Sequence, residues 1–536
     1  MGGAPYRSKG CNTCLRRKVK CDETKPECMR CLKNSHVCTG YERSRIFILN
    51  STEDTRALAR RPREPPKGQA KIGDASSSTA TKPAPDIPRF DVNPTIRTQF
   101  IANFIDCFVP SAAVRGGKGD AATHLQETFP VFIGTSPILD KAVTALSSAF
   151  FAKRNHDYQL LRHSTRLYAE SLQIVHRRIR MGRKCGQDSL FATVVFQLYE
   201  LINSSPLGFK AWLAHVQGSN AILSQYDSLN PSNVMEHLFC RQLKFVTVCD
   251  AIRMRKSAFS YSPFWRNPPS ESPWCEPIDT ILDSLLKCSA FMERIDHLVQ
   301  HGKPSLHPYR DKGEQLLSCC LALKGQIEHG FCKMQTKMGV PWSAPYQSSF
   351  WSELDHSIPG NLFSDSIEFP SLSCAESHLL YWTTFILLCQ LIDELLIFLN
   401  RTRNNLAFTL WDVPLSDTEG RSYATLITEF PDNLMDVAEH YANLICRSAK
   451  FLVQLETKAL GAQILLAPFS QATQFYHSQE ATEKHKWCQA VFTLFAKLGF
   501  GIAPFLKDMI WPKYEAATVK RLNSTSSEAS SDQPLS

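Results

Sequence analysis

The sequence predicts an all-α protein in three parts: a small cysteine-rich module over residues 8–41, a disordered linker over 42–92 and a large helical domain over 93–515. Three features of the chain support this prediction. Six of the 19 cysteines are crowded at regular intervals between residues 11 and 38. The next stretch is polar and rich in proline. From residue 93 onward, apolar residues recur at helical spacing, and no run of alternating strands competes with them.

The linker contains the strings RRPREPPKGQAK and ASSSTATKPAPDIP, which are too polar and too rich in proline to bury a core. Beyond it, Pro137 before Ile138 and Asp188 before Ser189 are ordinary signals for a helix start. The apolar periodicity predicts helices over residues 96–108, 138–152, 159–180, 189–202, 209–226, 278–299, 379–399 and 435–455. The serine-rich tail, residues 516–536, is predicted to be disordered.

Positive charge is concentrated at the N-terminus. Residues 1–90 hold 19 Lys and Arg against 9 Asp and Glu, whereas the rest of the chain holds 41 against 42. A basic arm on a neutral body is typical of a module that binds a polyanion. The N-terminus lacks the apolar core of a signal peptide, so a reducing compartment is expected, in which clustered thiols indicate metal binding. The apolar run 379–392 is too short to span a bilayer and is predicted to be a buried core helix, with no membrane partner.

The cysteine spacing is C-x2-C-x6-C-x6-C-x2-C-x6-C. Its first half, CNTCLRRKVKC, superposes on its second half, CMRCLKNSHVC, with an offset of 17 residues, which indicates two equivalent metal-binding turns. Structural zinc takes four thiolates, so two ions need eight bonds from six sulfurs, and two cysteines must bridge both metals. The predicted ligands of the two zinc ions are Cys11, Cys14, Cys21, Cys28, Cys31 and Cys38. Three disulfides, or one zinc with two spare thiols, are the alternatives.

These cysteines, together with Lys18, Lys20, Asp22 and Pro26, resemble the fungal binuclear zinc-cluster family of transcription factors. The resemblance implies a nuclear protein that binds double-stranded DNA sequence-specifically at CGG-containing promoter sites and regulates transcription by RNA polymerase II. In that family each half is a short helix followed by an extended strand. The short apolar patch IFIL follows the cluster here and no heptad repeat continues it, so a homodimer is possible but no coiled coil is predicted.

The first half is predicted to contact DNA. On a helix that starts near Cys14, Leu15 and Val19 share one side and the basic residues occupy the other, whereas the second half has lost three of four basic positions. The apolar side of the second half would hold Leu32 and His36. By resemblance Lys18, with Arg17 beside it, meets guanine O6 and N7. The predicted contacts are Arg16, Arg17, Lys18, Lys20 and Lys25, of which Arg16, Lys20 and Lys25 hold phosphates.

The helical body resembles, more diffusely, the fungal-specific transcription factor domain. The resemblance rests on the helix that ends in Tyr199 and Glu200 and on the spacing of Trp212, His215 and Gly218. It implies a regulatory domain that contacts coactivators or corepressors, in a regulator of metabolic or secondary-metabolite genes. Trp212 and His215 are expected to be core residues with a satisfied imidazole. The chain holds no phosphate loop, nucleophile elbow or zinc-protease helix, so no enzyme is predicted. An enzyme directed to DNA by its zinc module, and a protein or RNA interaction module, are the competing interpretations.

Residues 338–400 contain no Lys or Arg. Within them, acidic residues alternate with aromatic ones over 350–376, which is typical of an activation segment that folds onto a coactivator. The alternative is a long loop, interrupted by prolines such as Pro359 and Pro370, whose aromatic residues pack on the body. A fusion of residues 345–378 to an unrelated DNA-binding domain distinguishes the two. Only an activation segment raises reporter transcription in the fusion, and Trp351→Ala with Phe363→Ala should remove that effect.

Overall fold

The computed structural model describes residues 11, 13–14, 17–24, 28–34, 36, 38, 94–111, 114, 130, 134, 136–182, 184–204, 209–226, 233–266, 276–345, 362–363, 365–400 and 434–515. The chain divides into two compact units, Met1–Arg89 and Phe90–Ser536. The predicted linker and tail lie outside the described residues, and the predicted domain boundaries stay a prediction.

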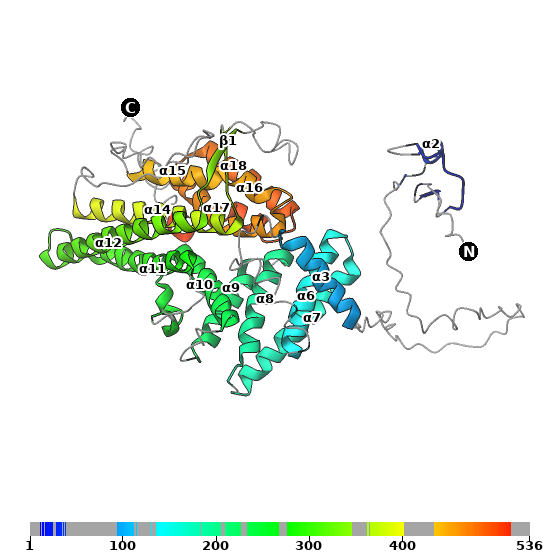
Figure 1. Cartoon of the computed structure of the whole chain (residues 1–536), viewed down its shortest axis with the longest axis horizontal. Helices are drawn as coiled ribbons and strands as arrows, with labels where there is room; N and C mark the ends of the chain where they lie inside the picture. The colour runs from blue at the N-terminus through cyan, green and yellow to red at the C-terminus, as the bar shows by residue number, and fades with distance from the viewer. Residues whose placement is uncertain are drawn as a thin grey trace, which may run out of the picture. The chain divides into compact units, whose positions relative to one another are not determined.

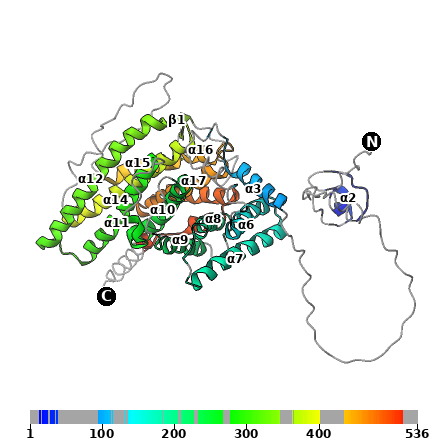
Figure 2. The ribbon, with the colours of Figure 1, turned by 60° about the horizontal axis from the view of Figure 1, so that its bottom comes forward.

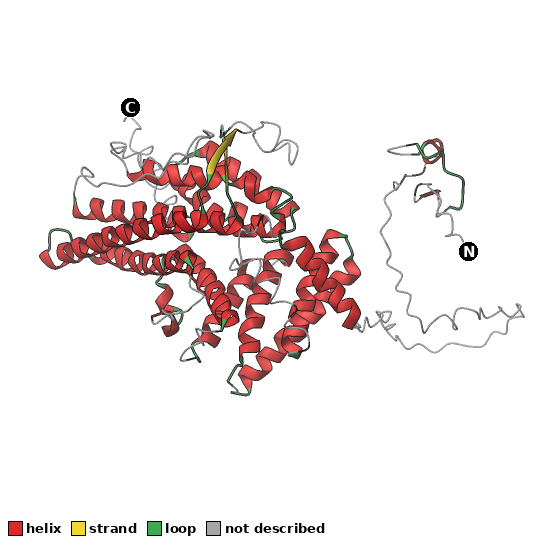
Figure 3. Ribbon diagram, in the orientation of Figure 1, coloured by secondary structure: helices red, strands yellow, loops and turns green. Residues whose placement is uncertain are grey.

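Within the described residues the fold class is confirmed, because helices dominate the second unit and the first unit contains no described strand (Figure 3). The first unit contains the short helix α2 (Met29–Lys33), and the second unit is built from long helices (Figure 1). Its helices are α3 (Pro94–Phe108), α6 (Pro137–Arg154), α7 (Tyr158–Arg180), α8 (Gln187–Asn203), α9 (Phe209–Leu223), α10 (Val234–Met254), α11 (Pro277–His301), α12 (His307–Met338), α14 (Leu372–Leu399), α15 (Leu434–Arg447), α16 (Ala449–Val453), α17 (Lys458–Ser478), α18 (Thr482–Lys497) and α19 (Ala503–Asp508). Two 3-10 turns, η2 (Ala258–Ser260) and η3 (Pro263–Arg266), follow α10.

Helices α3, α6, α7, α8 and α9 form one group within the body, in which α6 packs against α3, α7 and α8. Small buried residues let the α6 backbone approach its neighbours closely, and polar side chains of α7 bond to its carbonyl groups. The Ser164 hydroxyl donates to the Ala145 carbonyl (2.7 Å), and the Ser171 hydroxyl donates to the Ile138 carbonyl (2.8 Å). Ser136 caps the start of α6, with Pro137 in its first turn. Position 137 therefore begins this helix, as the sequence predicted.

Helix α14 is the centre of the second group, in contact with α11, α12, α15 and α17 (Figures 1 and 2). The Ser371 side chain caps its start, and Asn400 ends it in the left-handed conformation. It is the described helix that is long and apolar enough to cross a membrane, but 83% of its most apolar window is buried inside the protein. The predicted core helix over 379–392 is therefore confirmed, since its apolar surface is covered by neighbouring helices.

The structure corrects two details of the predicted body. The helix predicted over 435–455 is divided into α15 and α16 at Ser448, whose hydroxyl donates to the Leu444 carbonyl (2.8 Å), a bond that bends helices. A small antiparallel sheet also forms, although no strands were expected. Its strands β1 (Trp342–Pro345) and β2 (Asp365–Glu368) are too short to show an alternating pattern in the sequence.

The described part of the acidic-aromatic segment is packed on the body. The Phe363 ring lies edge-on to the Trp487 ring, with 5.1 Å between centroids, and Ile367 and Phe369 are buried. Trp351 lies outside the described residues. For residues 362–378 the structure therefore favours the packed loop over the activation segment.

Candidate metal centre and DNA-contact residues

The six N-terminal cysteines come together, and the spacing of their sulfur atoms fits zinc. The Cys28 Sγ lies 3.6 Å from both Cys11 Sγ and Cys14 Sγ, and the Cys31 Sγ lies 3.8 Å from the same two atoms. Tetrahedral coordination with a Zn–S bond of roughly 2.3 Å places neighbouring sulfurs about 3.8 Å apart. A disulfide needs roughly 2.05 Å, and all six cysteines are free. The geometry therefore contradicts the three-disulfide alternative.

The sulfur atoms form two groups of four, each compact enough to hold one ion. One group is Cys11, Cys14, Cys21 and Cys28, and the other is Cys11, Cys28, Cys31 and Cys38, with all ligand atoms of a group within 4.8 Å of one another. The two groups share Cys11 and Cys28, the first cysteine of each half. Six sulfurs can thus supply eight bonds, and the arrangement leaves no spare thiols of the kind that a single-zinc site would require.

Backbone hydrogen bonds to sulfur repeat the symmetry of the sequence. Cys11 N donates to Cys21 Sγ (3.3 Å), and Cys28 N donates to Cys38 Sγ (3.4 Å). Cys14 N likewise donates to Cys11 Sγ (3.4 Å), and Cys31 N donates to Cys28 Sγ (3.2 Å). These N–H groups favour the thiolate form of each sulfur, because they donate to its negative charge. The offset of 17 residues is therefore a repeat of structure as well as of sequence.

The helix of the first half is shorter than the sequence analysis assumed. Arg17 N donates to Thr13 O (3.1 Å), but Val19 N already reaches back to Cys14 O (3.0 Å), and Lys18 has a φ of 54°. A left-handed residue, followed by a backbone hydrogen bond that reaches back five residues, closes a helix. Lys20 is therefore past the helix end, and its predicted place on the helical face with Arg17 is wrong. The same bond recurs in the second half, from His36 N to Cys31 O (2.9 Å).

Asp22 joins the two halves, a role that the sequence analysis did not find. Its carboxylate accepts hydrogen bonds from Thr24 Oγ1 (2.7 Å) and from the backbone N–H groups of Met29 (3.2 Å) and Arg30 (2.5 Å) at the start of α2. The bonds from Thr24 and from this helix start lower the pKa of Asp22. Arg30 Nη1 in turn donates to Lys20 O (3.0 Å). The sequence signal for this role was an acidic residue seven positions before the start of a helix, because a carboxylate is stabilised near a helix N-terminus.

The described basic residues of the first half face solvent. Arg17, Lys18 and Lys20 are exposed, whereas the cysteines beside them are buried or half-buried. Arg16 and Lys25 lie outside the described residues. Val19 packs against the cysteine cluster as expected, but Leu32 is 49% exposed and His36 is exposed, so the predicted apolar side of the second half does not pack on it. Helix α2 is only five residues long, which leaves little surface to cover that side.

In the body, the residues that carried the second resemblance form a core network. The Tyr168 hydroxyl lies 2.7 Å from Glu200 Oε1 and 2.5 Å from His215 Nε2, and its ring stacks on Tyr199 with 4.2 Å between centroids. Burial lowers the pKa of His215 to about 4 and raises the pKa of Glu200. His215 is therefore a neutral, hydrogen-bonded core residue, as expected.

A buried thiol and imidazole also meet in α14. Cys374 Sγ lies 3.5 Å from His378 Nδ1, but this nitrogen also lies 2.8 Å from the Cys374 carbonyl oxygen. Burial raises the pKa of the Cys374 thiol to about 12 and lowers the pKa of His378 to about 4. The proton therefore stays on sulfur, which is the opposite of what a nucleophilic cysteine requires.

Comparisons with known proteins concern the N-terminal module. Residues 9–45 match the model of the fungal Zn(2)-Cys(6) binuclear cluster domain. The chain is 57% identical over 35 residues to the transcriptional regulatory protein moc3 of Schizosaccharomyces pombe, which is 6% of this chain and 7% of that protein. It is 48% identical over 33 residues to white-opaque regulator 2 of Candida albicans, again 6% of this chain and 7% of the relative.

The matched segments are thus a small fraction of the relatives' own lengths. No solved structure matches the chain significantly. Matched residues, cysteine geometry and internal symmetry agree on one conclusion. Residues 9–45 are a fungal Zn(2)-Cys(6) binuclear cluster domain, a module that binds two zinc ions and is homologous to the matched segments of fungal transcriptional regulators.

Proposed function

We propose that the protein is a nuclear, sequence-specific DNA-binding regulator of transcription by RNA polymerase II. The observation that carries this proposal is the exposed basic group Arg17, Lys18 and Lys20 on the first half of the zinc module. The six cysteines are the zinc ligands, with Cys11 and Cys28 bridging. Six thiolates and two zinc ions leave a net charge of about −2, so the local basic residues both offset the cluster and attract DNA.

Lys18 is the residue that reads bases. It stands where the helical turn ends, and its side chain lies in solvent. The backbone beside it is held in place by the hydrogen bond from Val19 N to the Cys14 carbonyl and by the cysteine cluster. An ammonium group at such a fixed position suits the O6 and N7 acceptors of guanine in a CGG site. Arg17 supports the same contact. Arg16, Lys20 and Lys25 bind phosphates and set the register of the module on the duplex.

The test compares two lysine variants of the full-length, zinc-loaded chain on CGG-containing and scrambled duplexes. Lys18→Gly removes the side chain while keeping the left-handed backbone that glycine favours. We expect it to weaken CGG binding by about 1 to 3 kcal/mol and to leave scrambled DNA nearly unaffected. Lys20→Ala should weaken both duplexes alike and reduce the salt slope by about 1. Fluorescence anisotropy at several salt concentrations measures both effects.

Unchanged zinc content and melting of both variants serve as the control. An equal loss on the two duplexes for Lys18→Gly would assign Lys18 to phosphate and overturn the base contact. No preference of the unaltered chain for any sequence in a randomised duplex pool would overturn sequence-specific binding itself.

The helical body is the regulatory part of this factor, and coactivators or corepressors are its partners. The genes it controls belong to a metabolic or secondary-metabolite pathway, and homodimers remain compatible with the module. The similarity of the N-terminal module to segments of fungal transcriptional regulators supports a regulator rather than an enzyme. The pKa values of the Cys374–His378 pair argue only against a nucleophilic thiol at that place. Mapping of bound genomic sites, combined with expression after deletion of the gene, identifies the pathway.

A further inference from the structure

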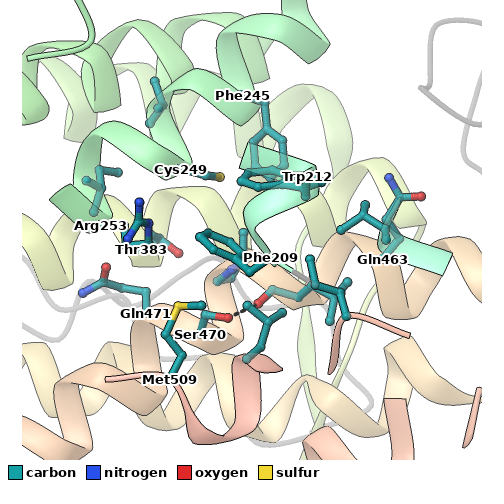
Figure 4. Close-up of a pocket in the computed structure, with 18 of the residues that line it drawn as sticks. Phe209, Trp212, Phe245, Cys249, Arg253, Thr383, Gln463, Ser470, Gln471 and Met509 are labelled. Carbon is teal, nitrogen blue, oxygen red and sulfur yellow. Dashed lines mark hydrogen bonds between the residues drawn. The ribbon is translucent and has the colours of Figure 1, made fainter. Parts of the chain in front are cut away.

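The helical body contains a partly open pocket where helices from distant parts of the chain meet. Its volume is about 130 Å³. Figure 4 shows Phe209 and Trp212 entering from α9, and Ser470 and Gln471 from α17. An engineered cavity of roughly 150 Å³ in another protein holds one benzene molecule. The pocket is slightly smaller than that cavity, so it has room for about one small ring, and its open side leaves space for a short substituent.

The chemistry of the wall selects a neutral and largely apolar occupant. Phe209, Trp212 and Phe245 are among its aromatic residues. Arg253 is the one charged side chain among the described residues that line the pocket, and its charge is already paired. Its Nη2 lies 2.6 Å from Asp250 Oδ1, and its guanidinium stacks 5.0 Å from the centroid of Phe209. An anionic ligand would lose its hydration without gaining an unpaired cation in return.

Three polar side chains among the described residues of the wall have a buried atom without a hydrogen-bond partner, namely Gln471, Trp212 and Gln463, and of these Gln471 has both amide atoms unpaired. Gln471 is 1% exposed, and neither its Oε1 nor its Nε2 has a hydrogen-bond partner. Trp212 is 7% exposed and its indole N–H is also unpaired. Leaving a buried polar group unsatisfied is costly, so such a group in a native protein calls for a partner, such as a water molecule, an ion or a ligand.

Gln474, one turn along the same helix, shows what a structural glutamine looks like here. It is equally buried, but its Nε2 donates to the Met509 carbonyl (2.8 Å) and its Oε1 accepts from Trp511 N (2.9 Å). Both of its amide atoms are therefore used to hold the chain beyond α19. The contrast assigns Gln471 a different task, because nothing described in the protein satisfies its amide.

Backbone hydrogen bonds fix the distance between two parts of the pocket wall. Gly501 N donates to Ile202 O (3.1 Å), and Ile502 N donates to Leu201 O (3.2 Å), which ties the start of α19 to the end of α8. A Cβ atom on Gly501 would lie 2.7 Å from the Ile202 carbonyl oxygen, so only glycine allows this approach. Leu201 and Ile502 both line the pocket, and their spacing is fixed by these bonds.

We propose that this pocket binds a neutral aromatic small molecule that carries a hydrogen-bonding group such as a carboxamide, with Gln471 as the residue that recognises that group. The ring occupies the apolar wall beside Phe209 and Trp212. The terminal torsion of a glutamine rotates easily, so the Gln471 amide turns to donate to a ligand carbonyl or accept from a ligand N–H. This inference stands independently of the DNA-binding function.

The test uses three probes on the full-length, zinc-loaded chain: benzamide, toluene and benzoate. Ligand-observed NMR gives their relative affinities. We expect benzamide to bind about five- to tenfold more tightly than toluene, because it satisfies the Gln471 amide. Benzoate should bind more weakly than benzamide, because its charge is desolvated without an unpaired cation. Ala467→Phe, a change in the wall, should abolish binding of all three probes by filling the space.

Two matched glutamine variants make the assignment specific. Gln471→Met keeps the approximate volume and should cancel the preference for benzamide over toluene, while raising the melting temperature of the ligand-free body. Gln474→Met should lower that melting temperature instead, because it removes two hydrogen bonds. Absence of benzamide binding to the unaltered chain overturns the proposal. A preference for benzamide that survives in Gln471→Met overturns it as well, even if Ala467→Phe fails to fold.

Discussion

Cys11 and Cys28 are the two cysteines that the two groups of sulfur atoms share. Each belongs to both groups of four sulfurs, whereas each of the other four cysteines belongs to one group. Each also accepts a backbone N–H, from Cys14 and Cys31 respectively. Loss of a shared sulfur therefore leaves both sites with three ligands, while loss of an outer sulfur leaves one site intact.

This difference predicts unequal zinc stoichiometry for two serine variants. Cys28→Ser should lose both zinc ions, because structural zinc requires four ligands. Cys38→Ser should retain one, since Cys11, Cys14, Cys21 and Cys28 remain together. Mass spectrometry under native conditions counts the bound ions, with the unaltered chain holding two as the reference. Equal zinc loss in the two variants would contradict the assignment of Cys28 as a shared ligand.

Between elements, the link from α10 to α11 shows how ion pairs fix two neighbouring helices of the body. Arg241 of α10 binds Asp279 of α11 through two hydrogen bonds, Nε to Oδ1 (2.9 Å) and Nη2 to Oδ2 (2.7 Å). Both residues are buried, and Asp279 also caps α11 by accepting from Glu276 N (2.8 Å). Burial alone would raise the pKa of Asp279, but hydrogen bonds from His237 and Arg241 outweigh burial and lower it.

Breaking this pair should destabilise the body more than removing it. Arg241→Met leaves a buried carboxylate without its main partner and should cost about 3 kcal/mol of unfolding free energy. The double variant Arg241→Met with Asp279→Asn keeps an oxygen to cap α11 and should be less destabilised than the sum of the single variants. Urea denaturation of the full chain measures all four proteins. Additive losses would show that the two side chains act independently.

The same pair gives a pH dependence of known sign. Because the folded pKa of Asp279 is below its unfolded value, its contribution is present above the unfolded pKa, roughly 3.9, and is lost as pH falls through the folded pKa. When the buffer is acidified below the unfolded pKa, roughly 3.9, Asp279→Asn should therefore lose less stability than the unaltered chain.

For the whole molecule, the division into two compact units predicts independent folding. Among its described residues, the core of the zinc module consists of its cysteines with Val19 packed against them, so we expect metal binding to supply its folding free energy. The body is a separate unit whose core consists of helices. A chelator should therefore release two zinc ions per chain and abolish specific DNA binding.

The body should meanwhile keep its helical circular dichroism and its melting temperature, within about 1 °C. Calorimetry with and without chelator, beside a DNA-binding titration, measures both units in one sample, and re-addition of zinc is the control. A body transition that shifts on chelation would reveal coupling between the units. DNA binding that persists in excess chelator would overturn the zinc requirement.

The sequence by itself determined the features that depend on local spacing. The cysteine intervals predicted two zinc sites, because ligand number and symmetry can be counted along the chain. Apolar periodicity predicted the long helices, including the buried α14. Helices α10, α12, α17 and α18 lie outside the predicted ranges. In α12, Gly313, Gly325 and Gly330 weaken a helical pattern that packing against α11 and α14 restores.

Only the tertiary structure decided which atoms meet. It placed Cys11 and Cys28 in both sulfur groups, put Lys18 in a left-handed turn at the helix end, and brought Asp22 to the start of α2. It also assembled the pocket around Gln471 from residues that are far apart in the chain. The physical reason is that spacing governs which residues share a helix face, whereas contacts between elements depend on how whole helices pack, which no local pattern contains.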